Sequence, residues 1–350
     1  MSSKTKKGMA QTVLGPVIPE KLGPTTTHEH LLTDLRFSFS PPSQPKHIGK
    51  AYEPVSIKNL GWVRFNHFNN LDNLVLDDID LAIEEVALYK ESGGGTIVDV
   101  TPIGISRNPE GLVRISESTG INIIMGSGYY VDDVHPDDMD DFSEEYLAAQ
   151  IVNDITEGVG DTGIKSGIIG EIGCSWPLTV NERKVLRAAA VAQSETGAPI
   201  LIHPGRAPGA PSEILDILSN ANADITRTII GHLDRTYTDL KDLLDLASSG
   251  CFLEYDLFGI EVSYFPFAEA DMASDAQRLD FIQFLVDEGY QNRIVIAQDI
   301  CRKERLVKYG GYGYAHILEN IVPWLLDRGL SPDQVDDITI RNPAEILTFV

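Results

Sequence analysis

Two histidines stand one residue apart near the start of the chain, in the stretch TTTHEHLL (25–32). Alternate side chains of an extended strand point to the same face, so the imidazoles of His28 and His30 are expected to project together. Two neutral imidazoles that point to the same place can share a metal ion. An isolated His-x-His pair fits an exposed loop equally well, and the rest of the chain must decide between the two.

Further metal-ligating side chains stand at the ends of strand-like runs later in the chain. The runs GIIGEI (167–172), PILIHP (199–204), RTIIGH (227–232) and RIVIAQD (293–299) carry, in that order, Glu171, His203, His232 and Asp299. In a parallel barrel the carboxyl-terminal strand ends meet at one rim, which is where the active sites of such barrels lie. Four histidines and two carboxylates from five strands are therefore expected to surround a space suited to two cations.

The alternative for each histidine is a structural role, since a single histidine at a strand end is more often hydrogen-bonded than metal-bound. Four of the eight histidines at equivalent strand ends are not explained in that way. The other four are predicted to be surface or packing residues: His47, His67, His135 and His316. Glu254 and Asp256, in the run CFLEYD (251–256), are expected either to support the ligands or to contact solvent or a helix terminus.

The order of the predicted elements indicates a (β/α)8 TIM barrel. After residue 90, short apolar runs typical of strands buried on both faces alternate with helical stretches, and these runs include GTIVDV (95–100) and INIIMG (121–126). Ser143 is predicted to cap one helix, and Thr179 with Glu182 to form a capping box for the next. With the His28 strand, eight strand–helix units can close into a barrel. An open doubly wound sheet is disfavoured because SGGGT (92–96) precedes a strand and therefore ends a helix.

The whole chain, residues 1–350, is predicted to form one domain. Residues 1–20 are assigned to an N-terminal extension. Residues from about 33 to 77, which include SPPSQP, are assigned to a long insertion after the first barrel strand, on the rim that carries the site.

The charge balance excludes several kinds of partner. Lys plus Arg number 28 and Asp plus Glu number 52, and the formal net charge of −24 repels nucleic acid and anionic membranes. An anionic small substrate would need a local cation. Cys174, Cys251 and Cys301 are widely spaced, which argues for a reducing compartment, and the polar N-terminus lacks an apolar secretory segment. A cytoplasmic protein is expected, and a homodimer is left open.

The motifs taken together resemble a known family. They are His28-x-His30, GIIGEIGCSWPLT, LIHPGR, GHLDR, LEYDLFG and IAQDICRKERLVKYGGYGYAHI, within a similarity that runs from QTVLGPV at residue 11 to NPAEILTF at the end. This set is similar to the phosphotriesterase-related family of the amidohydrolase superfamily. The resemblance implies a binuclear metal barrel in which His28, His30 and Asp299 hold one buried ion, His203 and His232 hold the second, and Glu171 bridges both.

One departure from the wider family bears on the reaction. Phosphotriesterases and related lactonases use a carboxylated lysine as the bridge, whereas this chain offers Glu171 and places Lys165 at the strand entrance, where a structural role is expected. Efficient organophosphate hydrolysis is therefore not expected. For the animal phosphotriesterase-related proteins, the resemblance implies hydrolysis of N-acetyltaurine to taurine and acetate. A lactonase or phosphotriesterase that uses the same centre is the alternative.

The chemistry expected of such a centre is metal-assisted hydrolysis of an amide. Two divalent ions lower the pKa of a bridging water so that hydroxide forms near neutral pH. Imidazole and carboxylate ligands favour Zn²⁺ and leave Mn²⁺, Co²⁺ and Fe²⁺ open. Asp299 is predicted to act as both ligand and general base, accepting the nucleophile's proton and passing it to the leaving amine.

Recognition of an anionic N-acyl substrate needs fixed cations. Arg206, three residues after His203, is the favoured candidate, and Arg235, three residues after His232, is the second. The alternative is that either arginine pairs with Asp234 or another rim acid. Further pocket residues are predicted at Tyr255 and Tyr129, with Ile103, Cys174 and Trp176 around the acetyl group.

Overall fold

Residues 7–268 and 270–350 are described by the computed structural model. Within them, eight parallel strands form one sheet in the order β12-β11-β10-β9-β8-β7-β6-β3. The strands are β3 (Thr25–Glu29), β6 (Thr96–Asp99), β7 (Asn122–Ser127), β8 (Ile168–Gly173), β9 (Ile200–His203), β10 (Thr228–Ile230), β11 (Phe252–Tyr255) and β12 (Ile294–Ile296). The backbone N–H of Asp299 donates to the carbonyl of His28 at 3.0 Å, so the first and last strands meet. All eight predicted strands are confirmed.

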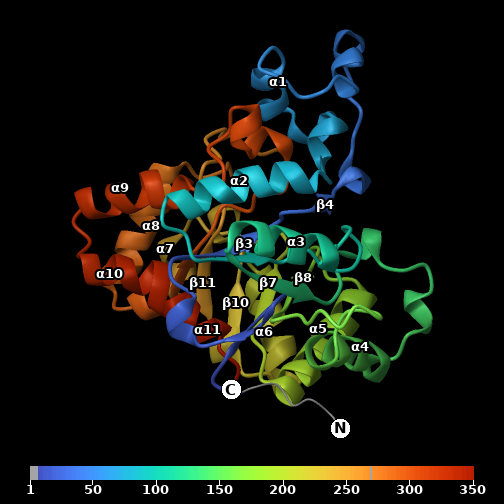
Figure 1. Ribbon diagram of the computed structural model, residues 1–350, viewed down its shortest axis with the longest axis vertical. Coiled ribbons are helices and arrows are strands. Elements are labelled where there is room, and N and C mark those ends of the chain that lie inside the picture. Colours follow the sequence, from blue (N-terminus) through green and yellow to red (C-terminus); the bar gives the residue numbers. More distant parts are fainter. Residues whose placement is uncertain (1–6, 269) are drawn as a thin grey trace.

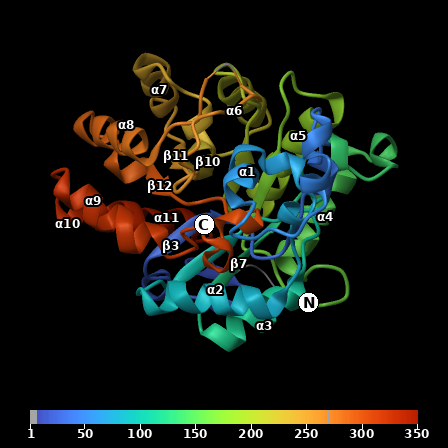
Figure 2. The ribbon, with the colours of Figure 1, turned by 90° about the horizontal axis from the view of Figure 1, so that it is seen from above.

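Helices surround these strands, as Figure 2 shows from above. They are α2 (Ile79–Glu91), α3 (Pro109–Thr119), α4 (Glu144–Thr156), α5 (Val180–Thr196), α6 (Ala210–Asn220), α7 (Leu240–Ala247), α8 (Asp275–Asp287), α9 (Val322–Asp327), α10 (Pro332–Asp336) and α11 (Asn342–Leu347). The Ser143 hydroxyl caps α4, and the predicted capping box of Thr179 and Glu182 begins α5. This alternation of strand and helix is the predicted TIM barrel (Figure 1).

The strands are hydrophobic on both faces because each face packs against a different layer. Side chains from seven strands meet in one buried cluster that fills the barrel interior: Val98, Ile124, Ile168, Leu201, Ile229, Phe252 and Val295. The residues next to them along each strand point the opposite way, toward the helices. Polar residues at the strand ends therefore stand above a closed apolar floor.

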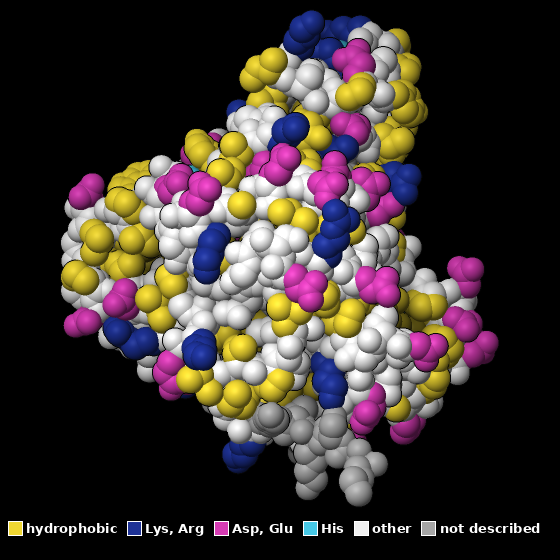
Figure 3. Space-filling view, in the orientation of Figure 1, with side chains coloured by type: hydrophobic (Ala, Val, Ile, Leu, Met, Phe, Trp, Pro, Cys, Tyr) yellow, Lys and Arg dark blue, Asp and Glu magenta, His cyan; other side chains and the backbone are white. Residues whose placement is uncertain are grey.

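The segment between β3 and α2 forms a lobe over one end of the barrel (Figure 1). At its base β4 (Thr33–Asp34) pairs antiparallel with β5 (Val75–Leu76), and between them lie short 3-10 turns and α1 (Leu60–Phe65). Figure 3 shows this lobe projecting from the body, with Lys and Arg side chains gathered at its tip. The lobe therefore lies at the strand ends that carry the polar residues.

None of the helices in the described residues has the length and apolar character needed to cross a bilayer. The cytoplasmic location and the homodimer stay predictions from the sequence.

The contact between β7 and β8 is a close backbone approach that only glycine permits. A Cβ added at Gly126 would lie 2.0 Å from the carbonyl oxygen of Gly170, which directly precedes Glu171, and 3.1 Å from Cα of Val100. We expect Gly126→Ala to lower the free energy of unfolding by about 1–3 kcal/mol or more, because backbone atoms must move. Urea unfolding followed by circular dichroism measures this change.

A glycine in open space provides the control. A Cβ at Gly61, in α1, would meet nothing within 4 Å. Gly61→Ala is expected to leave stability unchanged or to raise it by about 0.5–1 kcal/mol, since alanine is favoured over glycine in helices. Equal stability of the two variants would contradict the proposed crowding.

Candidate metal centre

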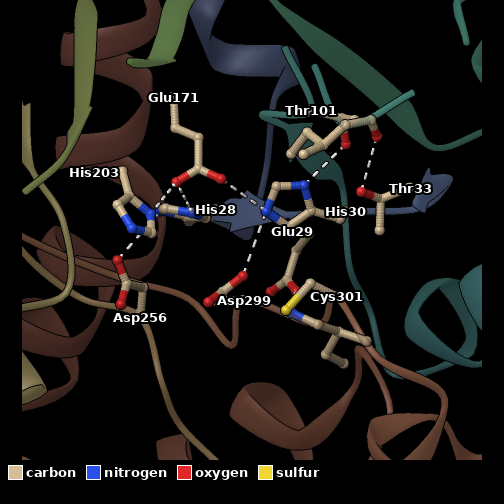
Figure 4. Close-up of polar contacts among 12 residues, drawn as sticks. His28, Glu29, His30, Thr33, Thr101, Glu171, His203, Asp256, Asp299 and Cys301 are labelled. Atoms are coloured by element: carbon tan, nitrogen blue, oxygen red, sulfur yellow. Dashed lines mark hydrogen bonds and ion pairs between the residues drawn. The ribbon is translucent and has the colours of Figure 1, made fainter. Parts of the chain in front are cut away.

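Glu171, on β8, faces His28, His30 and His203 (Figure 4) and also lies close to His232. Its Oε2 atom is 2.8 Å from Nδ1 of His203, 3.4 Å from Nε2 of His28 and 3.6 Å from Nε2 of His232. Its Oε1 atom is 3.1 Å from Nε2 of His30. One buried carboxylate thus faces imidazoles from three other strands, as a bridging ligand would.

Asp299 completes the group from the end of β12. Its Oδ1 atom lies 3.4 Å from Nε2 of His30. The side chain of Glu29 fixes this turn, because it accepts the backbone N–H groups of Gln298 and Ile300, each at 2.9 Å. Asp299 itself adopts a left-handed backbone with φ of 47°, which is uncommon for a residue other than glycine. The structure therefore brings together all six side chains that the sequence singled out.

Part of this spacing suits cations better than direct hydrogen bonds. Several separations of 3.4–3.6 Å exceed the ~2.7–3.2 Å of an N–H···O bond. Two ligands of one tetrahedral ion, each about 2.0–2.2 Å from it, lie roughly 3.3–3.6 Å apart. In addition, Nε2 of His28 is buried and has no hydrogen-bond partner within the described residues. An imidazole nitrogen left in this way is a donor atom suited to a metal ion.

Among the described residues, three groups of donor atoms lie close enough together to hold an ion, and His28 belongs to all of them; one group consists of His28, Glu254 and Asp256. In the other two sets, the ligand atoms of His28, His30 and Asp299 lie within 4.8 Å of one another, and so do those of His28, Glu171 and His232. His203 stands beside the second of these two sets, with its Nδ1 2.8 Å from Nε2 of His232. The grouping differs from the one implied by resemblance, because His28 belongs to both of these sets and His203 stands outside the second.

A second layer of side chains orients the histidines. Asp256 contacts Nδ1 of His232 at 2.8 Å and Nδ1 of His28 at 3.2 Å, and Glu254 contacts Nδ1 of His28 at 3.1 Å. The hydroxyl of Thr101 lies 2.9 Å from Nδ1 of His30. Contacts of this kind place the ring proton on Nδ1 and leave Nε2 free for a metal. Of the two roles weighed for Glu254 and Asp256, the structure shows the supporting one.

The electrostatic environment favours a positive charge at this point. Burial by itself would lower the pKa of His30, but hydrogen bonds and charge from Asp299 and Glu171 raise it to about 10. Burial would likewise raise the pKa of Glu171, but its contacts with His203 and His28 hold it well below its usual range. Burial and the neighbouring His232 lower the pKa of His203 to about 3, so its ring is a neutral electron-pair donor. A proton or a metal cation can supply the charge that the carboxylates attract.

A cavity of about 1330 Å³ opens above Glu171 and Asp299. Arg206 and Arg235 both line it. Arg235 is buried, and its Nη2 lies 3.2 Å from Nε2 of His203 while its Nη1 has no partner in the part of the chain that the structure describes. Neither guanidinium forms an ion pair with any described acid. Asp234, the acid considered as a partner from the sequence, pairs with Arg278. Both cations therefore remain available for an anionic ligand.

The prediction from the sequence was wrong at three pocket positions. Tyr129, Tyr255 and Ile103 are not among the described residues that line the cavity, whereas Cys174 and Trp176 are. Glu254 and Asp256 face the site, so strand alternation turns Tyr255 outward, where its ring stacks on Phe281 of α8. Tyr129 is buried in the core between helices and strands.

The residue after Tyr129 occupies the place expected for it. Tyr130 lines the cavity, and its hydroxyl lies 3.3 Å from Nδ1 of His203. A correct assignment of which residues of this segment face inward could have identified it.

The remaining residues weighed from the sequence have mostly structural roles. His316 contacts Asp275 at 2.8 Å, and Nε2 of His135 lies 2.8 Å from the Tyr130 carbonyl oxygen. Lys165 donates to the carbonyl of Thr156, away from Glu171. His67 is the exception, because it lines the cavity as well as packing against aromatic rings.

A TIM barrel with histidines and carboxylates gathered at the carboxyl-terminal strand ends defines a hydrolase of the metal-dependent class. The chain belongs to the phosphotriesterase family, whose model matches residues 8–347.

The chain has close relatives over its whole length. It is 49% identical to the N-acetyltaurine hydrolase of Xenopus tropicalis and 50% identical to the phosphotriesterase-related protein of Nematostella vectensis, with 98% of this chain and 98–99% of each relative covered. Its structure is similar to that of a resiniferatoxin-binding protein from Rhodobacter sphaeroides, with 36% identity, a TM-score of 0.95, and coverage of 99% of this chain and 98% of that one.

The carboxylates that orient the histidines predict an effect on metal affinity that is separate from any effect on stability. We expect Asp256→Asn to weaken divalent-metal binding by roughly 10–100-fold, because two imidazoles lose the carboxylate that orients them. Competition with a chelator, followed by elemental analysis, measures this affinity.

A second buried acid serves as the control. Asp154 accepts hydrogen bonds from Ser127 and Arg107, each at 2.8 Å, and touches none of the four strand-end histidines in the described structure. Asp154→Asn is expected to lower stability and leave metal affinity within about twofold. Equal loss of metal from both variants would show that the Asp256 effect is only destabilisation.

Proposed function

We propose that this chain hydrolyses N-acetyltaurine to taurine and acetate at a centre of two divalent cations, with Zn²⁺ favoured by the ligand types. The observation that carries the proposal is the convergence of His28, His30, His203, His232 and Asp299 around Glu171. The substrate is suggested by relatives about 49% identical over the full length that are named N-acetyltaurine hydrolases.

The bound cations would supply an ionised water at neutral pH and would polarise the amide carbonyl. Glu171 offers both of its oxygens to opposite sides of the group, one toward His30 and the other toward His203 and His28. This carboxylate takes the place of a carboxylated lysine, so assembly of the centre needs no carbon dioxide. Together the six side chains would hold the cations in one fixed arrangement, and that arrangement would orient the reacting water and the carbonyl.

Asp299 is the residue assigned to proton transfer. Burial would raise its pKa, but hydrogen bonding to His30 and the charges of His28 and His232 hold the pKa below its usual value, so the carboxylate is ionised and can accept a proton. During hydrolysis the water oxygen joins the acyl carbon and the carbon–nitrogen bond breaks. Asp299 takes the proton released by the water and returns it to the departing nitrogen. A poor leaving group such as an amine depends strongly on this delivery.

The cavity offers complementary groups for the two ends of the substrate. Arg206 and Arg235 can hold the sulfonate, and they compensate for the repulsion that a chain of net charge −24 exerts on an anion. Cys174 and Trp176 offer an apolar wall for the acetyl group. The proposed partner is therefore a small anionic N-acyl compound.

Substrate ranking tests the proposal directly. We expect the kcat/KM for N-acetyltaurine to exceed that for a simple lactone and for paraoxon by at least about 100-fold, because two arginines bind the sulfonate. Product formation is followed for all three compounds on the same metal-loaded preparation. A larger kcat/KM for the lactone or for paraoxon would replace the amidase assignment with the alternative hydrolase.

The Asp299→Asn variant separates proton transfer from metal holding. The amide retains an oxygen for the metal but loses the basic site, so kcat is expected to fall by roughly 10²–10⁴-fold while metal content is partly retained. Initial rates and elemental analysis are measured on the same sample. Full activity in this variant would rule out Asp299 as the base.

A further inference from the structure

Phe267 is the centre of an aromatic cluster on the cavity wall. It lies in the loop between β11 and α8 and is 46% exposed. Its ring centroid is 5.1 Å from that of Phe68 and 6.1 Å from that of His67, both in the insertion, and 5.5 Å from that of Phe265. Two segments that are about 200 residues apart therefore meet at this ring, beside the cavity that opens over Glu171.

The guanidinium of Arg206 rests on this cluster. Its central carbon is 5.7 Å from the Phe267 ring centroid and 5.8 Å from the Phe265 ring centroid. Arg206 makes no ion pair with a described residue, and its side chain is exposed. An exposed arginine loses rotamer freedom when it binds an anion, and rings that already restrain the side chain reduce that cost. Each exposed cation–π contact corresponds to roughly a 2- to 5-fold effect on an equilibrium.

The cluster is anchored to the same wall as the proposed metal centre. The guanidinium of Arg302 lies 5.5 Å from the Phe68 ring centroid, and its Nε donates to Glu304 at 2.9 Å. Arg302 follows Asp299 by three residues, so the rings are tied to the segment that carries the proposed base. This connection fixes where Arg206 stands relative to the reacting atoms.

We propose that Phe267 is a positioning residue that holds Arg206 over the cavity and thereby sets the selectivity for substrates with an anionic head group. The inference rests on the proposed function, because Arg206 is there assigned to the sulfonate. It goes beyond that function by assigning part of substrate selection to a ring that contacts the arginine instead of the anion.

Two amide substrates test the proposal. N-acetyltaurine carries the sulfonate, and N-acetylethanolamine keeps the same amide and two-carbon arm with a neutral hydroxyl group. Phe267→Ala is expected to raise KM for N-acetyltaurine by about 2- to 5-fold with kcat within twofold, and to change both constants for N-acetylethanolamine by less than twofold. Phe267→Tyr, which keeps the ring, is expected to restore the wild-type KM.

A matched variant in the same loop controls for loss of aromatic surface. Tyr264 lines the cavity and is 49% exposed, but its ring stacks on Phe65 at 4.7 Å. Tyr264→Ala is expected to leave the ratio of kcat/KM for the two substrates unchanged. A shift in that ratio as large as the one in Phe267→Ala would overturn the proposal.

A double-mutant cycle shows whether Phe267 acts through Arg206. In the Arg206→Gln background, Phe267→Ala is expected to have no further effect on KM for N-acetyltaurine. Independent, additive effects of the two substitutions, or equal losses on both amides, would overturn the positioning role.

Titration with taurine distinguishes failure of this inference from failure of the proposed function. If the wild-type protein hydrolyses no N-acetyltaurine, the proposed function fails. Calorimetry with taurine then tests the role of Phe267 by itself. This role requires that the wild-type protein bind taurine and that Phe267→Ala weaken the binding by about 2- to 5-fold. Undetectable taurine binding by the wild type, or unchanged affinity in the variant, would overturn it.

Discussion

Three buried carboxylates and a fourth that is partly buried lie together at one end of the barrel, and this concentration of negative charge constrains the rest of the site. Glu171, Glu254, Asp256 and Asp299 are all within contact distance of an imidazole. Transfer of an unpaired carboxylate into a protein interior costs so much that such groups are paired or bind metals. Because cations offset that cost, binding of metal is expected to be coupled to the stability of the strand ends themselves.

The contacts that hold these carboxylates in place extend well beyond the candidate ligands. Asp256 accepts the backbone N–H of His232 at 2.8 Å, and its own N–H donates to Asp234 at 2.9 Å. Arg278 pairs with Asp234 and with Asp275, which in turn contacts His316. A continuous chain of hydrogen bonds and ion pairs therefore links the imidazole of His232 to α8. Such a network holds the rings in one orientation, because each member is held by the next.

The barrel and the candidate ligands could be predicted because both leave local marks in the sequence. Buried parallel strands read as short apolar runs, and a histidine or acid at the end of such a run is visible without knowledge of the fold. It is harder to predict from the sequence which single side chains point into the cavity. The sequence pattern favours Tyr129, whereas Tyr130 lines the cavity, and this shift of one residue reverses the direction of the side chain.

Contacts between loops left no such mark. Phe267 lies close to Phe68 and Arg206 only because three segments converge over the barrel, and nothing in the spacing of those residues indicates it. The role of Glu29 is likewise not visible in the sequence, although it stands between His28 and His30, because that role depends on the closure of β12 against β3. Sequence patterns thus identify what each strand end carries and leave open how the connecting segments meet.

The division between strand ends and connecting loops has a consequence for diversification. The six candidate ligands belong to the framework strands or to the turns directly after them, whereas the rings that contact Arg206 lie in a longer loop. Substitutions in the connecting loops can therefore alter which molecule is accepted while the ion-holding framework stays intact. A library restricted to residues 260–268 and 64–69 would explore new substrates with little risk of losing the hydrolytic apparatus.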